Sequence, residues 1–396
     1  RTTKIKLENF KFIPYGRQDI AEEDIEAVVK VLKSDFLTQG PIVPEFEQKI
    51  CDYTGAKHTV AVNSCTSALH IACLALDLGP GDILWTSPIT FVASANCALY
   101  CGATVDFVDI DPDTALMSVA LLEKKLKEAE LSGKLPKVVV PVHFSGQSCD
   151  MANIYSLSKK YNFFIIEDAA HAIGGSYRGK KIGCCKYSHI TVFSFHPVKI
   201  ITTGEGGAAM TNNKEYAQKM ELLRSHGITR DPSAMKKKID GPWYYEQIDI
   251  GFNYRMTDIQ AALGVSQIKR LDSIVKKRHA IKERYDREFS DLPLTLLEDK
   301  HSTYSACHLY VVRINTNRIK KDRSTIFKAL QDKGICVNVH YIPVHHQPIY
   351  DELTDLKDSC PNADNFYREA ITLPIFYDIK IHEQTKVIDL IVTEIK

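Results

Sequence analysis

Between about residues 50 and 215, short apolar segments alternate with helical patterns, and this alternation constrains the fold more than any other feature of the sequence. Several apolar segments, such as residues 137–144, are nearly continuous runs, which is typical of strands that are covered on both faces. The alternation predicts a doubly wound α/β domain with a mostly parallel sheet. We expect strands over residues 58–64, 103–110, 137–144, 162–168, 189–195 and 206–212, and helices over 66–79, 91–102 and 151–162, the last with Asp150 as its N-cap.

The rest of the chain predicts a second, smaller unit. A long helical pattern over residues 257–289 follows an irregular aromatic stretch and links the first domain to this unit. Strand patterns return over 308–314 and 335–341, so we expect a small α/β domain at the C-terminus. The predicted organisation is a large domain with an N-terminal arm over residues 1–265, a linking helix over 266–289 and a small domain over 290–396.

Charge and cysteine usage exclude several classes of protein. The formal net charge of +1 gives no global field that would attract nucleic acid or an anionic membrane. The first twelve residues have no apolar core that would form a secretory signal, and no apolar run is long enough to span a bilayer. The eleven cysteines are scattered without C-x-x-C or zinc-ligand spacing, so we expect no metal site and a reduced, cytoplasmic protein.

Lys199 stands where the strand pattern of residues 189–195 gives way to the glycine-rich turn 202–207 (TTGEGG). Glu167 and Asp168 end an earlier predicted strand, and ligands of open α/β sheets bind outside the carboxyl ends of strands. An acid and a lysine in these places suit pyridoxal phosphate, whose aldehyde forms a Schiff base with the lysine while the acid binds the pyridine nitrogen. Desolvation would have to lower the pKa of the lysine. The spacing alone leaves open a solvated surface lysine and a structural carboxylate.

A cradle for the phosphate of such a cofactor is expected at residues 63–72, a strand-to-helix turn rich in hydroxyl groups. The N-terminus of a helix has free backbone N–H groups that bind anions, and Thr66 and Ser67 lie in this turn. Ser194 could add a hydroxyl group, and Phe91 could stack on a flat ring. A plain helix cap and a core phenylalanine explain the same residues, and the sequence leaves these alternatives open.

Seven stretches that follow one another along nearly the whole chain carry a family resemblance. They are 37–41 (LTQGP), 63–72 (NSCTSALHIA), 87–96 (SPITFVASAN), 167–177 (EDAAHAIGGSY), 193–208 (FSFHPVKIITTGEGGA), 222–227 (LLRSHG) and 251–264 (GFNYRMTDIQAALG). In this order they resemble the DegT/StrS-type sugar aminotransferases, a fold-type-I pyridoxal phosphate family. The resemblance implies an α/β fold with a large, mostly parallel, doubly wound sheet domain and a smaller C-terminal α/β domain.

The resemblance implies catalytic roles for three residues. Lys199 would form the Schiff base with the cofactor and then carry the proton to and from the substrate carbon. Asp168 would bind the pyridine nitrogen, and His171 would lie near the ring or its phenolic oxygen. One branch of the family replaces the lysine by histidine and dehydrates its substrate, so the presence of Lys199 favours transamination.

The resemblance also implies a cofactor site that two subunits share. Phe91 would stack on the ring, while the backbone N–H of Thr66 and the side chains of Ser67 and Ser194 would hold the phosphate. Asn253 would reach the phosphate from the partner subunit, so the protein is expected to be a homodimer with its active site at the subunit interface. The glycine run is then interpreted as a tight turn that lets the backbone pass close behind the cofactor.

Four stretches narrow the expected substrate. Residues 194–208, 222–228, 308–314 and 337–350 are most similar to the branch of the family that acts in pseudaminic acid biosynthesis. That branch aminates C4 of a UDP-linked 4-keto-6-deoxy-N-acetyl hexose and uses L-glutamate as the amino donor. By this resemblance, the residues expected to contact the substrate are Tyr15, Gln39, Gln147, His340 and Tyr341.

Three alternatives to this substrate and activity remain open. The first is an aminotransferase for another nucleotide-linked keto sugar, acting at C3 or C4. The second is a related reaction, such as dehydration of a keto sugar or transamination of an amino acid. The third is a non-catalytic regulator that senses a sugar nucleotide on the same fold.

Overall fold

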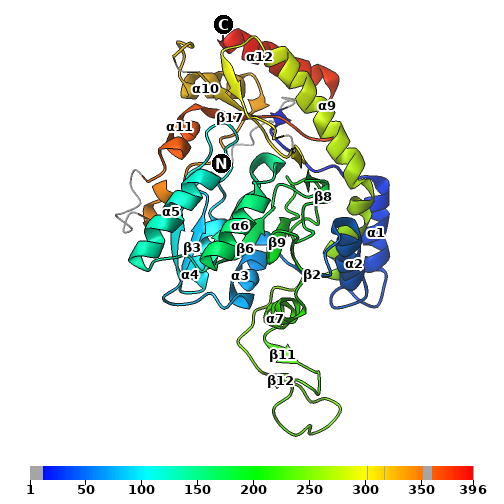
Figure 1. The fold of residues 1–396 in the computed structure, drawn as a ribbon. Coiled ribbons are helices and arrows are strands. Elements are labelled where there is room, and N and C mark those ends of the chain that lie inside the picture. Colours follow the sequence, from blue (N-terminus) through cyan, green and yellow to red (C-terminus); the bar gives the residue numbers. More distant parts are fainter. Residues whose placement is uncertain (1–11, 301, 316, 351–358, 396) are drawn as a thin grey trace, which may run out of the picture.

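The structure of the protein is a computed structural model that describes residues 12–300, 302–315, 317–350 and 359–395 (Figure 1). Residues 1–11 lie outside the described residues. They belong to the N-terminal segment in which we expect no secretory signal. Among the described residues, no helix is both long enough and apolar enough to cross a membrane. The central sheet lies in the middle of the molecule, and the C-terminal helices gather at one end of it (Figure 1).

Seven of the described strands form the central sheet, in the order β2-β10-β9-β6-β5-β3-β4. Every neighbouring pair is parallel except the two pairs that β10 makes, with β2 and with β9. The mostly parallel sheet is therefore confirmed, and β9 and β10 are buried along their whole length, as expected for strands covered on both faces. The strands are β2 (His58–Val62), β3 (Ile83–Thr86), β4 (Thr104–Phe107), β5 (Val138–Val140), β6 (Phe164–Asp168), β9 (Ile190–Ser194) and β10 (Gly207–Thr211).

The helices of this domain begin close to the expected places, with two differences in their caps. α3 (Cys65–Ala75) has Ser64 as its N-cap, whose Oγ accepts a 3.1 Å hydrogen bond from the backbone N–H of Ser67. Asp150 is the N-cap of α6 (Met151–Tyr161), but its carboxylate accepts hydrogen bonds from the Tyr177 hydroxyl and the Asn153 amide instead of from the helix backbone. The other helices are α1 (Glu22–Leu32), α2 (Ile42–Thr54), α4 (Ala93–Tyr100), α5 (Val119–Ser132) and α7 (Lys214–Arg224).

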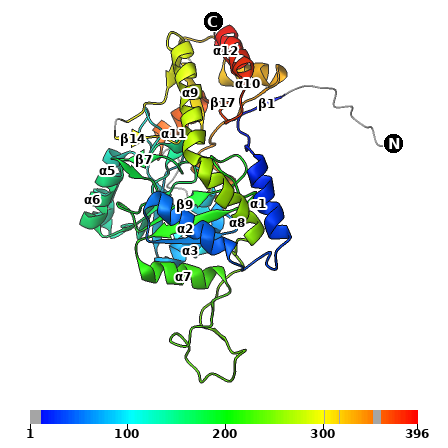
Figure 2. The same ribbon diagram turned by 90° about the vertical axis from the view of Figure 1, so that its right-hand side faces the viewer.

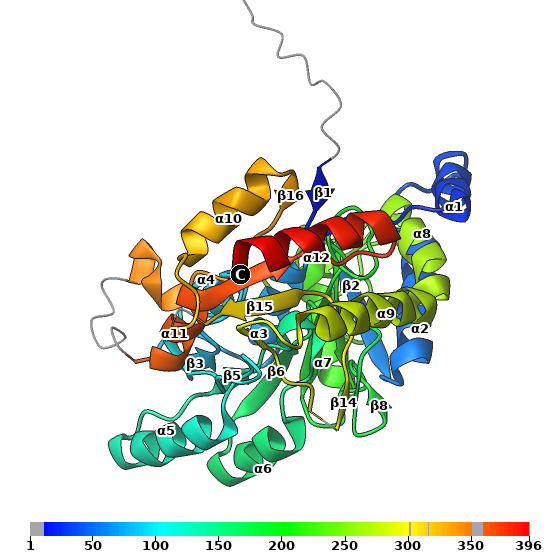
Figure 3. The same cartoon turned by 90° about the horizontal axis from the view of Figure 1, so that it is seen from above.

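The helices surround the sheet in groups. α3 packs against β9, β10, α4 and α7, while α2 packs against β2. Seen from above, α5 and α6 lie together on one side of the molecule, and α1 lies on the opposite side (Figure 3). A further small sheet, β14-β7-β8, joins β7 (Ser176–Tyr177) and β8 (Lys180–Lys181) to β14 (Thr303–Tyr304) from the C-terminal part of the chain.

The stretch expected to be helical over residues 257–289 is helical in the structure, but it is divided into three consecutive elements. α8 (Asp258–Gln267) is followed by a short 3₁₀ turn, η2 (Ile268–Arg270), and then by α9 (Leu271–Phe289). Side chains at the junction turn toward α1, since Gln267 and Arg270 donate hydrogen bonds of 2.6 and 2.7 Å to the buried carboxylate of Asp24. α8 therefore stays on α1 and α2, whereas α9 extends to the C-terminal core (Figure 2).

The C-terminal region has its own three-stranded antiparallel sheet, in the order β13-β15-β17, which confirms the smaller α/β part. The strand expected over 335–341 is only two residues long, because β16 (Ile335–Cys336) pairs with β1 (Ile13–Pro14) and the chain then turns toward the central sheet. The domain boundaries given above remain a prediction. The elements are β13 (Leu294–Leu296), β15 (Tyr310–Ile314), α10 (Arg323–Asp332), η3 (Val344–His346), η4 (Pro348–Tyr350), α11 (Pro361–Glu369), β17 (Ala370–Leu373) and α12 (Ile381–Ile395).

The segment between α7 and α8 extends away from the body of the molecule (Figures 1 and 2). Its two short strands, β11 (Ile228–Thr229) and β12 (Glu246–Gln247), pair antiparallel. Trp243 and Ile250 near this hairpin are 69% and 78% exposed, so the segment presents apolar side chains to solvent in the single chain. Asn253, the residue expected to reach a partner subunit, lies at the base of this segment.

Candidate active site

A cavity of about 810 Å³ opens at the carboxyl ends of β6 and β9. Asp168 is the last residue of β6, Ser194 is the last residue of β9, and Lys199 lies in the turn that follows β9. All three line the cavity. Because β6 and β9 are parallel neighbours, their carboxyl ends meet at one edge of the sheet, where ligands of open α/β sheets bind.

Lys199 is half-buried and lines the cavity. This burial lowers the pKa of Lys199 to about 8, although Cys65 and the carboxylate of Asp168 act in the opposite direction. The turn that presents the side chain is closed by a 2.9 Å hydrogen bond from the backbone N–H of Lys199 to the carbonyl of His196. At neutral pH, a far larger share of this amine is unprotonated and nucleophilic than for a lysine in water.

Two hydrogen bonds fix the carboxylate of Asp168, which is 5% exposed. Ser94, on α4, donates its hydroxyl to Oδ2 at 2.6 Å, and the backbone N–H of Ala170 donates to Oδ1 at 3.1 Å. Ser94 in turn shares a 2.7 Å hydrogen bond with Thr90. Ser94 was not predicted to be a site residue, although it lies in the stretch 87–96 (SPITFVASAN). Its only signal is a hydroxyl group in the helix that begins beside the cavity.

Glu167, the other acid at the end of β6, points away from the cavity because successive side chains of a strand face opposite sides. Its carboxylate accepts hydrogen bonds from Nε2 of His143 at 2.7 Å, from the Thr191 hydroxyl at 3.0 Å and from the Ser188 hydroxyl. The backbone N–H of Cys149 donates to Nδ1 of His143, so the proton of this imidazole lies on Nε2. Glu167 is therefore part of a buried structural network, and Asp168 alone of the two acids faces the cavity.

Histidine and tyrosine side chains form part of the cavity wall. His171 lies 3.1 Å from the Tyr341 hydroxyl through Nε2, and the centroid of its ring lies 4.4 Å from that of the His308 ring, which is tilted against it by 45°. Burial and the positive charge of Lys199 lower the pKa of His171 well below its ordinary value, so its imidazole is neutral. Burial also lowers the pKa of His340 to about 3. His308, which starts the stretch HLYVVRI, gave no sign in the sequence that it would reach the cavity.

The start of α3 forms the hydroxyl-rich end of the cavity. Thr66, Ser67 and Ser194 line it, as the sequence analysis predicts, and Ser64 and Cys65 do so as well. The Ser67 hydroxyl donates to Asn63 at 2.7 Å and lies 2.9 Å from the Ser64 hydroxyl. The first backbone N–H groups of a helix have no partner within the helix, so this end suits an anion.

Gly207 explains the glycine run that follows Lys199. A Cβ atom on Gly207 would lie 2.5 Å from the backbone of Ser64 and of Cys65 at the start of α3. Only glycine lets β10 pass this close to the helix N-terminus. The glycine therefore allows a close approach of two backbones behind the cavity, in agreement with the interpretation of the run as a tight passage.

The structure brings most of the other predicted residues to the cavity. Tyr15, Phe91, His340 and Tyr341 line it, and Phe91 is 60% exposed with its ring 6.5 Å from the ring of Tyr341. Phe91 is therefore a surface residue of the cavity and not a core residue. The sequence left open whether Phe91 is a core residue or a residue that stacks on a flat ring, and its exposure excludes a place in the core.

Gln147 lies outside this cavity, and its expected contact with the substrate remains a prediction. Its side chain is buried and makes hydrogen bonds with three nearby residues: its amide donates to the Glu298 carbonyl, and its oxygen accepts from Lys300 and Thr303. It therefore fixes the segment that follows β13 and does not line the cavity.

Gln39 and Asn253 also lie outside the cavity of their own chain. Gln39 is exposed, and its segment is held against the start of α8, where Asp258 accepts hydrogen bonds from Gly40 and Ile42. The expected contact of Gln39 with the substrate remains a prediction. Asn253 is exposed as well, which is where a residue that serves a partner subunit has to lie.

The profile of the DegT/DnrJ/EryC1/StrS aminotransferase family matches residues 18–392. The chain belongs to this family. It is 39% identical to the UDP-4-amino-4,6-dideoxy-N-acetyl-beta-L-altrosamine transaminase of Campylobacter jejuni over 372 residues, which are 94% of each chain.

Solved structures of the family agree with the fold. PseC of Helicobacter pylori, described as an aminotransferase of pseudoaminic acid biosynthesis, superposes with a TM-score of 0.88 at 33% identity, covering 97% of this chain and 99% of its own. The PLP form of the sugar aminotransferase Spr1654 of Streptococcus pneumoniae superposes with a TM-score of 0.86 at 31% identity, covering 96% of this chain and 98% of its own. The chain is a pyridoxal phosphate-dependent sugar aminotransferase by family.

The residues of the cavity fit pyridoxal phosphate. Lys199 offers an amine with a lowered pKa, Asp168 offers an oriented carboxylate, and the start of α3 offers N–H and hydroxyl groups for a phosphate. In addition, Nδ1 of His171 and Nδ1 of His308 are buried without a hydrogen-bond partner among the described residues. Such atoms in the wall of a cavity are free to meet a bound ligand.

Proposed function

We propose that this cavity transfers an amino group from L-glutamate to C4 of a UDP-linked 4-keto-6-deoxy-N-acetyl hexose. The observation that carries the proposal is the convergence of Lys199 and Asp168 on one cavity at the carboxyl edge of the sheet. The similarity to the transaminase of C. jejuni and to PseC supports this choice of sugar. The alternative is another nucleotide-linked keto sugar, aminated at C3 or C4.

Lys199 and Asp168 would perform the central steps. Bound pyridoxal phosphate supplies an aldehyde that takes up amino groups and a ring that draws electrons from the substrate carbon. Lys199 would hold the cofactor through its amine and, once released, would carry the proton to and from that carbon. The burial that lowers the pKa of Lys199 keeps the amine available for both tasks. Asp168, oriented by Ser94, would hold a proton on the pyridine nitrogen.

The start of α3 would hold the phosphate. The backbone N–H of Thr66 and the hydroxyl groups of Ser67 and Ser194 would bind its oxygens, while the exposed ring of Phe91 would cover one face of the cofactor ring. Asn253 of a second subunit would complete the phosphate site. Its exposure, outside the cavity of its own chain, supports a homodimer.

The histidine and tyrosine side chains of the cavity wall would bind the substrate and orient the ring. Tyr15, His340 and Tyr341 all line this wall. Burial raises the pKa of Tyr341, so its hydroxyl keeps its proton and can donate it in a hydrogen bond. The neutral imidazole of His171, held by Tyr341, would contact the ring or its phenolic oxygen.

An amination assay across UDP-, dTDP- and GDP-linked keto sugars, with L-glutamate as donor and the products identified by NMR, tests this proposal. We expect amination at C4 of the UDP-linked N-acetyl sugar at a much higher kcat/KM than with the other sugars. Preferred amination of another nucleotide sugar, or at C3, would support the alternative. An absorbance change with L-glutamate but no amination of any keto sugar would contradict both.

A further inference from the structure

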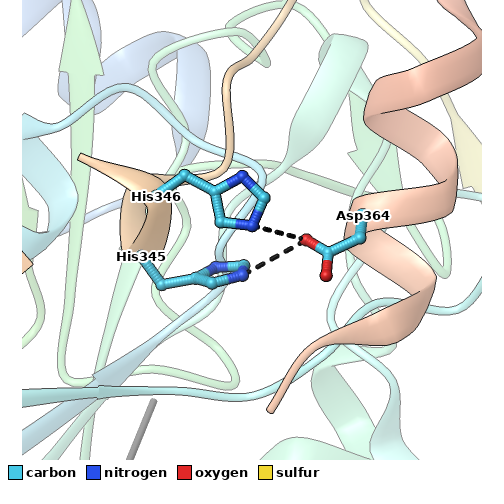
Figure 4. Close-up of side chains that lie close together, drawn as sticks. All are labelled: His345, His346 and Asp364. Atoms are coloured by element: carbon cyan, nitrogen blue, oxygen red, sulfur yellow. Dashed lines mark ion pairs between the residues drawn. The ribbon is translucent and has the colours of Figure 1, made fainter. Parts of the chain in front are cut away.

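Outside the cavity, three side chains with metal-binding atoms converge on one point (Figure 4). His345 and His346 are neighbours in η3, and Asp364 lies on α11. Oδ1 of Asp364 is 3.3 Å from Nε2 of His345 and 2.9 Å from Nε2 of His346. One ligand atom from each residue lies within 4.8 Å of the other two. None of the three residues lines the active-site cavity.

The hydrogen bonds of this cluster are incomplete. The His345 side chain is only 1% exposed, yet neither of its ring nitrogens has a hydrogen-bond partner among the described residues. Oδ1 of Asp364 is also buried without a partner of acceptable geometry in the same part of the chain. The atoms are close but not aligned as donor and acceptor. Burying unpaired polar atoms is unfavourable, so this arrangement indicates a missing ligand.

The three converging atoms, two imidazole nitrogens and one carboxylate oxygen, are suited to bind a cation. His345 and His346 each present Nε2 to the same carboxylate oxygen of Asp364, and imidazole nitrogens are common metal ligands. Two imidazole nitrogens and one carboxylate oxygen are typical ligands of Zn²⁺, which takes three or four protein ligands in a tetrahedral arrangement. Ca²⁺ and Mg²⁺ prefer oxygen ligands only.

We propose that His345, His346 and Asp364 bind one zinc ion through Nε2, Nε2 and Oδ1, with water as the fourth ligand. His345 and Asp364 form the buried side of the site, whereas the His346 side chain is 40% exposed and leaves a path for the ion and the water. The cysteine spacing predicted no metal, and this site contains no cysteine. The ligands of the zinc site come from two separate elements, η3 and α11, so the residue spacing within one motif could not predict the site.

The zinc site has a structural role, because it joins η3 to α11. The N-terminus of α11 is already fixed, since Asp109 accepts hydrogen bonds from the backbone N–H groups of Asn362 and Ala363. η3 follows the segment that carries His340 and Tyr341 into the cavity. A zinc ion would therefore tie the substrate-binding wall to the C-terminal region, at a distance from the reacting atoms.

Zinc binding can be measured on the whole chain without a histidine tag. The protein is first stripped of metal by a chelator and is loaded with pyridoxal phosphate. Isothermal titration with Zn²⁺ is expected to show one site, and His345→Gln and Asp364→Asn are each expected to weaken it at least tenfold. His382→Gln, which removes an exposed histidine of α12, is the matched control and should change nothing. Absence of stoichiometric binding, or equal affinity in all variants, would overturn the proposal.

Co²⁺ gives a second test that separates this site from the cysteines. Tetrahedral cobalt bound to nitrogen and oxygen absorbs in the visible region without the thiolate charge-transfer bands that cysteine ligands add. We expect these visible bands in the wild type and their loss in His346→Gln, whose half-exposed side chain can be replaced without disturbing the fold. Far-ultraviolet circular dichroism verifies that each variant is folded. Thiolate bands in the wild type, or cobalt bands that survive in folded His346→Gln, would contradict the assignment.

Discussion

The Ser94 hydroxyl lies 2.6 Å from Oδ2 of Asp168, although the two residues are 74 positions apart and belong to different elements. Ser94 comes from the first turn of α4, and Asp168 from the end of β6. The hydrogen bond holds the carboxylate in the orientation that faces the cavity, so Ser94 is a positioning residue for the acid on which the cofactor depends.

Ser94→Ala should therefore weaken the binding of pyridoxal phosphate. A hydrogen bond to a charged group contributes about 1.5–3 kcal/mol, so the Kd of the cofactor should rise tenfold or more. Absorbance titration of the apo-enzyme with the cofactor measures this value. Ser156→Ala, which removes an exposed hydroxyl bonded to the backbone of α6, is the matched control and should leave the Kd unchanged. If the Ser94→Ala enzyme binds pyridoxal phosphate with wild-type affinity, Ser94 does not position Asp168 for the cofactor.

The lowered pKa of Lys199 predicts how the reactivity of the apo-enzyme depends on pH. An amine reacts only when it is unprotonated, so acylation of Lys199 should rise with pH through about 8 and level off above it. Lysines in water have pKa values near 10.4, so surface lysines should still be gaining reactivity there. Peptide mass spectrometry after brief labelling at a series of pH values measures the acylation of Lys199 and of the surface lysines in one sample. A Lys199 profile that follows the surface lysines would show that burial does not shift its pKa.

Gly207→Ala tests the close passage of β10 behind the start of α3. The new Cβ would meet the backbone of Ser64 and Cys65 at 2.5 Å, so the helix N-terminus or the strand has to move. We expect a loss of about 1–3 kcal/mol in the free energy of unfolding, together with weaker cofactor binding. Gly79→Ala, at a position with open space around the glycine, is the control for urea denaturation and cofactor titration. If both variants have the same stability, the passage is not tight.

The buried network of Glu167 predicts a structural and not a catalytic defect. Glu167→Ala removes the shared acceptor of three buried donors, which belong to His143, Ser188 and Thr191. The free energy of unfolding should fall by about 3 kcal/mol or more, as measured by urea denaturation. Glu123→Ala, which removes an acid from the exposed face of α5, should have little effect. A fully stable Glu167→Ala protein would contradict the network.

The sequence was most informative where chemistry and local pattern coincide. Lys199, Asp168, Thr66, Ser67 and Ser194 follow recognisable strand ends or a strand-to-helix turn, and the structure brings all of them to one cavity. The parallel order of the strands explains this, because it places their carboxyl ends at one edge. The mostly parallel sheet was predictable for the same reason, since nearly continuous apolar runs mark its strands.

Contacts between distant segments were not predictable. Ser94 and His308 reach the site only because α4 and the start of β15 pack beside the sheet, and no local pattern marks such contacts. β3 (Ile83–Thr86) was not predicted, although it pairs with β4 and β5 in the central sheet. The break after α8 follows from hydrogen bonds of Gln267 and Arg270 to α1, which a helical periodicity cannot reveal.

Spectroscopy of the two half-reactions tests the central claim most directly, that Lys199 serves as the amine of a sugar aminotransferase. The purified wild-type enzyme should be yellow, its absorbance band should shift when L-glutamate is added, and the UDP-linked 4-keto sugar should restore the band as the amino sugar forms. Lys199→Ala should lose the shift and all turnover while its circular dichroism stays that of the wild type. Amination by Lys199→Ala at the wild-type rate would contradict the account.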